Sequence, residues 1–316
     1  MGVMSLDPAD AALGVRAIHA ACDAGVTTFD TAPLYGFGAA EELLGRAIAD
    51  RRSRVQVLTK AGLRWDAAHG RVMFEFADGR GARRAVRKDS RPASIREEVE
   101  ASLRRLGVEC IDVLQLHQPD VDTPIEQTAE ALAALLRQGK LRAVGASNFS
   151  VRQLESLREA LHPLPLVCVQ DEYNLLERRV EAALLPWARD AGTGVLAYSP
   201  LAKGVLAGGR RAPSYLHAAD LARANAAIEA VLAPIARARG VAPGQLALAW
   251  VLAQPGVVAV VAGARTPEQA LSNAGAAALV LDGAEERRLR EAFDGFRGVR
   301  RGLLARLAGK LRRVLG

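Results

Sequence analysis

The chain has 316 residues, of which half are apolar and 24% are charged, a composition typical of a globular protein with a large core. Three cysteines, Cys22, Cys110 and Cys168, lie apart in apolar segments without a CxxC pair, so we expect reduced core thiols, no bound metal and a cytoplasmic location. The formal net charge of +7 equals the number of cations in residues 297–316, which contain no acid. Residues 1–296 are therefore formally neutral, and the lack of a basic surface charge on this part argues against a nucleic-acid partner.

No membrane span or secretion signal is evident at the level of sequence. No apolar run reaches the ~18 residues that a spanning helix needs, and the N-terminus has no charged segment leading into an apolar stretch. The basic tail at 297–316 is the one segment for which contact with a membrane surface is an alternative. Within residues 302–316, apolar side chains recur at helical spacing with cations between them, so the tail either packs on the body, frays in solvent or lies on an anionic membrane.

Short β-branched runs alternate with amphipathic helical stretches along the whole chain. The runs are nearly continuous in apolar character, as parallel strands covered on both faces must be. The seven predicted strands are residues 26–30, 55–59, 111–117, 143–147, 166–170, 195–199 and 257–263. Helices are expected to begin at Pro92, Pro124 and Pro243, because proline suits a first helical turn. The pattern predicts one TIM-type (β/α)8 parallel barrel over residues 1–296, followed by the tail at 297–316.

The start of the chain departs from an eight-stranded barrel. Only residues 1–6 precede Asp7 and Pro8, where the first helix begins, so we expect the first strand to be missing or reduced to a stub. An open barrel leaves two strand edges unpaired. We therefore expect the natural start to lie upstream and the chain as written to be poorly stable or weakly active. The alternatives are a stub within residues 2–6 that pairs in the gap, or a neighbouring chain that fills it.

A doubly wound dinucleotide-binding sheet is the main rival fold. That fold requires a GxGxxG motif directly after its first strand. The nearest match begins at Gly36 and Gly38 but places Glu41 where the third glycine should allow close helix packing, and a polar loop separates it from the strand. The motif therefore favours the barrel.

Polar side chains follow almost every predicted strand. Because chemistry in parallel barrels collects at the carboxyl ends of the strands, we read these positions as one candidate site. They are Asp30, Lys60, His117, Ser147, Asn148, Gln170, Tyr198, Ser199 and Arg265, with Tyr35 in the loop after the first of them. Taken singly, each could be a strand end, a solvated side chain or a satisfied core histidine. Because they recur at one face of the predicted barrel, a functional site is favoured over these separate structural roles.

Four of these residues suit proton transfer beside a hydride donor. A free tyrosine has a pKa near ~10, and an adjacent ammonium such as Lys60 stabilises the phenolate. A buried lysine needs a carboxylate partner, for which Asp30 is the obvious candidate. His117 could then hydrogen-bond and orient the substrate oxygen.

The chain resembles the aldo-keto reductases over nearly its whole length. The matching segments, in order, are GVTTFDTAPLYG, GAAEELLG, LTK, SLRRLGVECIDVLQLHQPD, GKLRAVGASNF, VQDEYNLLERR, AYSPLAKGVLAG and VVAGARTPEQALSN. The resemblance implies a catalytic tetrad of Asp30, Tyr35, Lys60 and His117, with Tyr35 as general acid in reduction. It also implies a nicotinamide cofactor held by Ser147, Asn148 and Gln170, with Tyr198 stacked on the ring. Further cofactor contacts are implied at Ser199, Pro200, Leu201, Gly204, Gly263, Gln269 and Asn273.

The segment around Arg265 predicts an anion site. Thr266 is a good helix cap and Pro267 suits the first helical position, so a helix N-terminus faces the active rim and its backbone amides attract phosphate. The forked guanidinium of Arg265 fits a 2′-phosphate, which favours NADP(H) over NAD(H). The alternative is a surface arginine beside an ordinary cap.

Residues 62–91 form an excursion longer than a typical barrel loop. Val72, Phe74 and Phe76 alternate and Asp78-Gly79 is a hairpin turn signal, so we expect a hairpin at the rim. With Trp65 and Phe37 it could wall a substrate pocket, or it could be a solvated hairpin without ligand contact.

Two functions are compatible with these observations. The first is an NADPH-dependent enzyme that reduces an aldehyde or ketone to the alcohol, with a small carbonyl compound as its partner. The second is a regulatory protein that binds the cofactor with little turnover, and the intact tetrad argues against it. Neither the physiological substrate nor the oligomeric state follows from the sequence.

Overall fold

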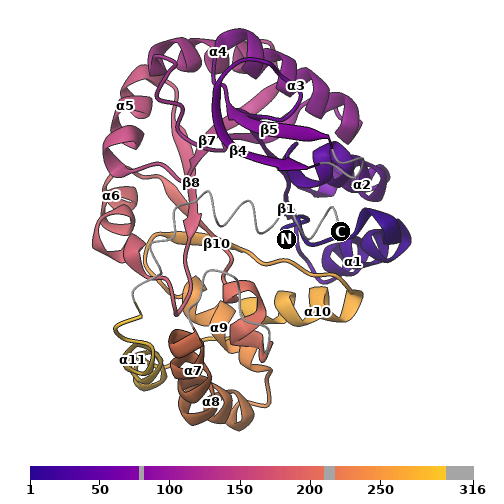
Figure 1. The fold of residues 1–316 in the computed structure, drawn as a ribbon. Coiled ribbons are helices and arrows are strands. Elements are labelled where there is room, and N and C mark those ends of the chain that lie inside the picture. Colours follow the sequence, from indigo (N-terminus) through magenta and orange to yellow (C-terminus); the bar gives the residue numbers. More distant parts are fainter. Residues whose placement is uncertain (78–81, 210–217, 297–316) are drawn as a thin grey trace.

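The computed structural model describes residues 1–77, 82–209 and 218–296 (Figure 1). The expected hairpin turn at Asp78-Gly79 and the basic tail at 297–316 lie outside the described residues. Within the described part, no helix is long and apolar enough to cross a membrane.

Among the described residues, the main sheet has seven parallel strands that follow sequence order, and each pairs with the next strand of the same sheet. The strands are β1 (Thr28–Asp30), β2 (Gln56–Ala61), β6 (Ile111–Leu116), β7 (Leu141–Ser147), β8 (Leu166–Glu172), β9 (Gly194–Tyr198) and β10 (Val257–Val261). All seven predicted strands are confirmed, and the sheet is a barrel that closes almost completely.

Residues near the N-terminus occupy the gap between β1 and β10. Gly2 bridges Asp30 on one side and Gly263 on the other, and its backbone N–H donates to Ala262 O at 2.9 Å. The Asp30 N–H donates to Met1 O at 2.8 Å. The expected stub is therefore present, and it connects the two edge strands of the sheet through single-residue bridges.

Helices surround the barrel, as Figure 1 shows. They are α1 (Ala11–Asp23), α2 (Ala39–Ile48), α3 (Pro92–Leu106), α4 (Ile125–Arg137), α5 (Val151–Leu161), α6 (Leu184–Asp190), α7 (Ala218–Ala227), α8 (Ala233–Ala238), α9 (Pro243–Leu252), α10 (Pro267–Gly275) and α11 (Gly283–Ala292). Helix α3 begins at Pro92 as predicted and ends at Leu106. Gly107 caps it with a φ of 64°, the left-handed conformation that terminates many helices. Apolar side chains from these helices and the strands form one large core cluster, and a smaller cluster of Leu58, Cys168 and Leu196 comes from β2, β8 and β9.

The excursion after β2 folds into a separate antiparallel sheet of β3 (Leu63–Arg64), β5 (Arg83–Lys88) and β4 (Arg71–Ala77). The predicted alternation is broken by a bulge between Val72 and Phe74, which leaves Val72 42% exposed. One face of the sheet packs on Leu34, and Phe76 stacks on Phe37 with ring centroids 5.1 Å apart. The excursion is therefore packed against the loop that carries Tyr35.

Candidate active site

A buried ion pair lies at the carboxyl ends of β1 and β2. Lys60 Nζ is 2.6 Å from Asp30 Oδ2 and also donates to Thr31 O at 2.9 Å. The lysine side chain is only 1% exposed. Burial alone would lower the pKa of Lys60, but the neighbouring Asp30 carboxylate and Tyr35 raise it, and the net direction is upward. The ammonium is therefore the stable form in this position.

The second carboxylate oxygen of Asp30 accepts two amide hydrogen bonds. Gln115 Nε2 donates to Asp30 Oδ1 at 3.0 Å and Gln170 Nε2 donates to the same atom at 2.8 Å. Gln170 also donates to Gln115 Oε1 at 3.1 Å. Gln170 was predicted to contact the cofactor, and Gln115 was not predicted as a site residue. A glutamine within the otherwise apolar run of β6 was the visible signal, whereas its position opposite Lys60 is known only from the strand register.

Tyr35 and His117 lie above this ion pair. Their rings meet edge to face with centroids 5.9 Å apart, and Lys60 Nζ is 5.3 Å from the centroid of the Tyr35 ring. Burial raises the pKa of the Tyr35 hydroxyl and Asp30 adds to the rise, while the charge and hydrogen bonding of Lys60 act in the opposite direction. The structure thus brings all four predicted tetrad residues together, with a tyrosine that holds its proton at neutral pH.

The Tyr35 loop has an unusual backbone. Gly36, Phe37 and Gly38 adopt φ values of 60°, 54° and 99°, three consecutive residues in the left-handed region. Such conformations are rare for side chains like that of Phe37 and persist only where the surroundings hold them. The stacking of Phe37 on Phe76 supplies part of that support.

A second polar group follows β7 and β9. Asn148, at φ 64°, donates through Nδ2 to His117 O at 3.0 Å and to Ser147 Oγ at 2.9 Å, and accepts from the Tyr198 hydroxyl at 2.9 Å. Ser147 is buried and Asn148 is partly exposed. These predicted cofactor residues therefore form one connected network beside His117.

The predicted phosphate segments lie at the ends of β9 and β10. Ser199 at φ 51° and Gly204 at φ 97° bend the loop after β9, which also contains the predicted residues Pro200 and Leu201. After β10, the Arg265 N–H donates to Gln269 Oε1 at 2.9 Å and Asn273 Nδ2 donates to Gly263 O at 3.1 Å. Both amides thus brace this loop.

The N-terminus of α10 forms as predicted. The Thr266 hydroxyl caps the helix by accepting from the Gln269 N–H, and Pro267 occupies the first turn. Arg265 is exposed, and its guanidinium makes no hydrogen bond or ion pair with another residue in the described ranges. The side chain is available to a ligand.

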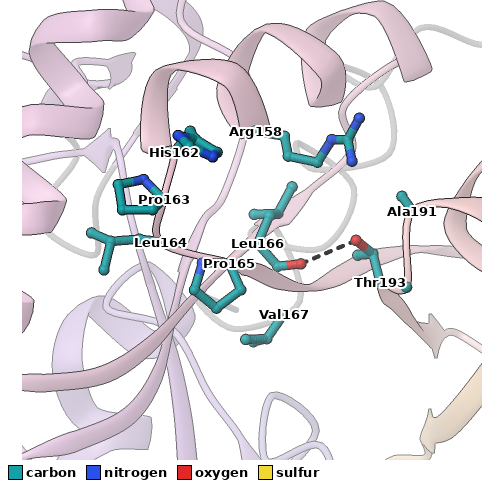
Figure 2. A pocket seen from close by; sticks show the side chains of 10 residues that line it. Arg158, His162, Pro163, Leu164, Pro165, Leu166, Val167, Ala191 and Thr193 are labelled. Carbon is teal, nitrogen blue, oxygen red and sulfur yellow. Dashed lines mark hydrogen bonds between the residues drawn. The ribbon is translucent and has the colours of Figure 1, made fainter.

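A pocket of about 330 Å³ lies elsewhere, at the amino ends of β8 and β9 (Figure 2). Figure 2 places Arg158 and His162 well apart above Leu166, whose carbonyl accepts from the Thr193 hydroxyl at 3.0 Å. The pocket is at the opposite end of the barrel from the tetrad and has no part in it. No cluster of three metal-ligating side chains occurs among the described residues.

A parallel barrel with this set of residues at its carboxyl rim fits the expected class of oxidoreductase. Residues 1–294 match the aldo/keto reductase family model. Aldo-keto reductase YhdN of Bacillus subtilis is 38% identical over 274 residues, which cover 82% of this chain and 77% of the relative. The NADH-specific methylglyoxal reductase of Escherichia coli is 36% identical over 84% of this chain and 83% of the relative. The chain belongs to the aldo/keto reductase family of oxidoreductases.

Solved structures agree with this assignment. The glycerol dehydrogenase of Gluconobacter oxydans superposes with a TM-score of 0.80 at 37% identity, covering 92% of this chain and 90% of that chain. An aldo/keto reductase from Klebsiella pneumoniae in complex with NADP and acetate superposes with a TM-score of 0.71 at 30% identity, covering 93% of this chain and 90% of that one. The predicted fold class and family are confirmed.

Proposed function

We propose that this chain is an NADP(H)-dependent enzyme that reduces an aldehyde or ketone to the alcohol, with Tyr35 as the general acid. The observation that carries the proposal is the buried Asp30–Lys60 pair at 2.6 Å directly beneath Tyr35 and His117. A paired ammonium beside a phenol is the arrangement that lets a tyrosine exchange protons, because it stabilises the phenolate left after transfer.

Each tetrad residue has a separate task in this proposal. The Tyr35 hydroxyl gives its proton to the substrate carbonyl oxygen, and Lys60 stabilises the phenolate that remains. Asp30 keeps Lys60 charged in its buried position. His117, edge-on to the Tyr35 ring, orients the substrate oxygen by hydrogen bonding. The nicotinamide cofactor, when bound, supplies the hydride that adds to the carbonyl carbon.

The residues at the rim fit a dinucleotide. Ser147, Asn148 and Gln170 would face the carboxamide, with Tyr198 held against Asn148 for stacking. The loop from Ser199 to Gly204 contains four residues with positive φ, a backbone of the kind that forms anion-binding concavities, and it would run along the pyrophosphate. The α10 N-terminus with Arg265 would take the 2′-phosphate.

Arg265 also bears on the choice between NADP(H) and NAD(H). Two structural neighbours from Klebsiella pneumoniae are complexes with NADP and with NADPH, whereas one relative is named as NADH-specific. The exposed guanidinium of Arg265 favours NADP(H). We expect Arg265→Ala to weaken NADPH binding about 10- to 100-fold, as for the loss of a hydrogen bond to a charged group, and to leave NADH nearly unchanged. Arg46→Ala, another exposed arginine, is the control. Equal weakening of both cofactors would place the 2′-phosphate elsewhere.

The decisive experiment follows NADPH absorbance with a reactive test aldehyde. Tyr35→Phe should reduce the rate on the order of 10²- to 10⁴-fold, as expected for lost general acid catalysis, while the NADPH dissociation constant stays within about twofold. The Tyr173 hydroxyl donates to Glu181 and to no tetrad residue, so Tyr173→Phe should retain activity. Cofactor binding without turnover in the wild type would instead support the regulatory alternative.

A further inference from the structure

A fully buried glutamate lies on α2, the helix that begins directly after the Tyr35 loop. Glu41 has no exposed surface, yet it takes no part in the tetrad. Buried carboxylates are expensive unless they are paired and hydrogen-bonded. The position of Glu41 therefore needs an explanation in terms of its partners.

Both carboxylate oxygens of Glu41 are occupied, and the partners come from different elements. The Thr59 hydroxyl of β2 donates to Glu41 Oε1 at 2.6 Å, and Arg105 Nε of α3 donates to Oε2, also at 2.6 Å. The carboxylate thus connects β2, α2 and α3. The three side chains are here named the Glu41 cluster.

The strand alternation gives the cluster its relation to the catalytic lysine. Thr59 precedes Lys60 in β2, and successive side chains of a strand point to opposite faces. Lys60 points into the barrel, where it meets Asp30, so Thr59 points out towards the helical layer and reaches Glu41. The Thr59 hydroxyl therefore links α2 to β2 at the position directly before Lys60.

Arg105 contacts the Tyr35 loop as well as Glu41. A Cβ atom at Gly38, the last residue of the loop, would lie 2.7 Å from Arg105 Cδ, and Gly38 also needs its φ of 99°. The arginine side chain thus fills the space beneath the end of the loop. Glu41 in turn holds the guanidinium in place through the 2.6 Å contact.

We propose that Glu41, through Thr59 and Arg105, is a positioning residue that fixes the Tyr35 hydroxyl relative to Lys60. The inference rests on the proposed function of Tyr35 and Lys60, and it adds residues in the helical layer to their support. The Tyr35 loop is then braced from two sides, by the Phe37–Phe76 stack on the excursion sheet and by the Glu41 cluster beneath it.

The distance from Tyr35 to Lys60 affects proton transfer. Lys60 opposes the rise in the Tyr35 pKa that burial causes, and this effect weakens as the two groups move apart. Reduction requires a protonated tyrosine, so its rate falls at high pH as Tyr35 loses its proton. If Tyr35 is displaced from Lys60, kcat should therefore fall, and the decrease in rate at alkaline pH should begin at a higher pH.

The test variant is Thr59→Val, which removes the hydroxyl and keeps the side-chain shape. We expect kcat to fall about tenfold or more, the scale of effect that small misplacement of a reacting group produces. The Km for aldehyde and the NADPH dissociation constant should stay within about twofold, because the cluster touches neither ligand. The alkaline limb should shift upward, and Thr59→Ser should restore both rate and pH profile. Glu41→Gln, which keeps an acceptor for Thr59 but loses the charge that pairs Arg105, should show the same pattern.

A matched control separates positioning from general stability. Thr128 of α4 is a fully buried threonine whose hydroxyl donates to Ser90 O at 2.8 Å, so Thr128→Val removes a buried threonine hydrogen bond outside the cluster. Thr128→Val should lower the melting temperature of the protein and leave the pH dependence of kcat unchanged. Wild-type kcat and pH profile in folded Thr59→Val, or the same changes in Thr128→Val, would overturn the proposal. If Tyr35→Phe keeps wild-type activity, the proposed function itself is wrong, which is a distinguishable result.

Discussion

Glu98 provides a pH-dependent test of the packing beneath the excursion sheet. This glutamate of α3 is 5% exposed, and its Oε1 accepts from the Gly62 N–H at 2.8 Å, two residues after Lys60. Its Oε2 has no hydrogen-bond partner among the described residues. Burial raises the pKa of the Glu98 carboxyl to about 8, although the Gly62 hydrogen bond and Arg64 oppose the rise. The folded protein therefore holds a neutral acid at this position at pH 7.

The sign and size of the effect on stability follow from proton linkage. In the unfolded chain Glu98 loses its proton near pH 4.5, whereas in the folded protein it keeps it to about pH 8. The free energy of unfolding that Glu98 contributes is therefore fully present below pH 4.5 and is lost progressively as the pH rises to 8. At about 1.4 kcal/mol for each unit of pKa difference, the loss is on the order of 3 to 5 kcal/mol. That is a large part of the ~5–15 kcal/mol that stabilises a typical domain.

Glu98→Gln retains an acceptor for Gly62 and cannot ionise. We expect the variant to gain stability relative to the wild type as the pH rises from 5 to 8, and the difference to become constant above pH 8. Urea unfolding at closely spaced pH values measures this slope. Glu42→Gln, an exposed glutamate on α2, should show no comparable slope. Parallel stability curves for wild type and Glu98→Gln would refute the reasoning, whatever constant offset the amide introduces.

Two further predictions concern the tetrad and the helix layer. Asp30→Asn should lower the pKa of Lys60, because burial would no longer be countered by a charge, and should reduce kcat with a changed pH profile; an unchanged profile would contradict the assigned pairing. Gly45→Ala should destabilise the fold by about 1–3 kcal/mol, since the added Cβ would lie 2.5 Å from Leu106 O and push α2 from α3; a wild-type urea midpoint would show that the helices can separate freely.

Much of the barrel could be predicted from the sequence because parallel strands buried on both faces leave a strong pattern. Residues 111–117 are apolar except for one acid, Gln115 and His117. The sequence therefore predicted both a strand here and a polar side chain at its carboxyl end. Lys60 likewise required an acid by elementary electrostatics, and Asp30 is that acid at 2.6 Å.

Side-chain contacts that depend on strand register and side-chain direction could not be predicted from the sequence pattern. Gln115 contacts Asp30 only because β6 pairs with β2 so that Gln115 lies opposite Lys60. The bulge between Val72 and Phe74 broke an alternation that looked regular. Gln269 and Asn273 were assigned to a ligand, whereas their amides also satisfy backbone groups of their own loop. Each outcome follows from local geometry that residue types alone do not specify.

The two faces of β2 explain why the catalytic geometry needs more than the tetrad. Lys60 is held from inside the barrel by Asp30, and Thr59 is held from outside by Glu41. A strand of parallel sheet fixes its backbone through neighbouring strands, but the loop that carries Tyr35 has no such ladder and contains three left-handed residues in succession. Its backbone is held by the Thr31 N–H, which donates to Leu58 O, and by the Tyr35 N–H, which donates to Ala32 O, so side-chain contacts must supply the rest of its support. The excursion sheet contributes apolar contacts at Leu34 and Phe37, and the Glu41 cluster contributes charged hydrogen bonds. Apolar contacts are non-directional and allow small shifts, whereas hydrogen bonds to a carboxylate are directional and short, so the cluster is the part of this support that can define the distance from Tyr35 to Lys60.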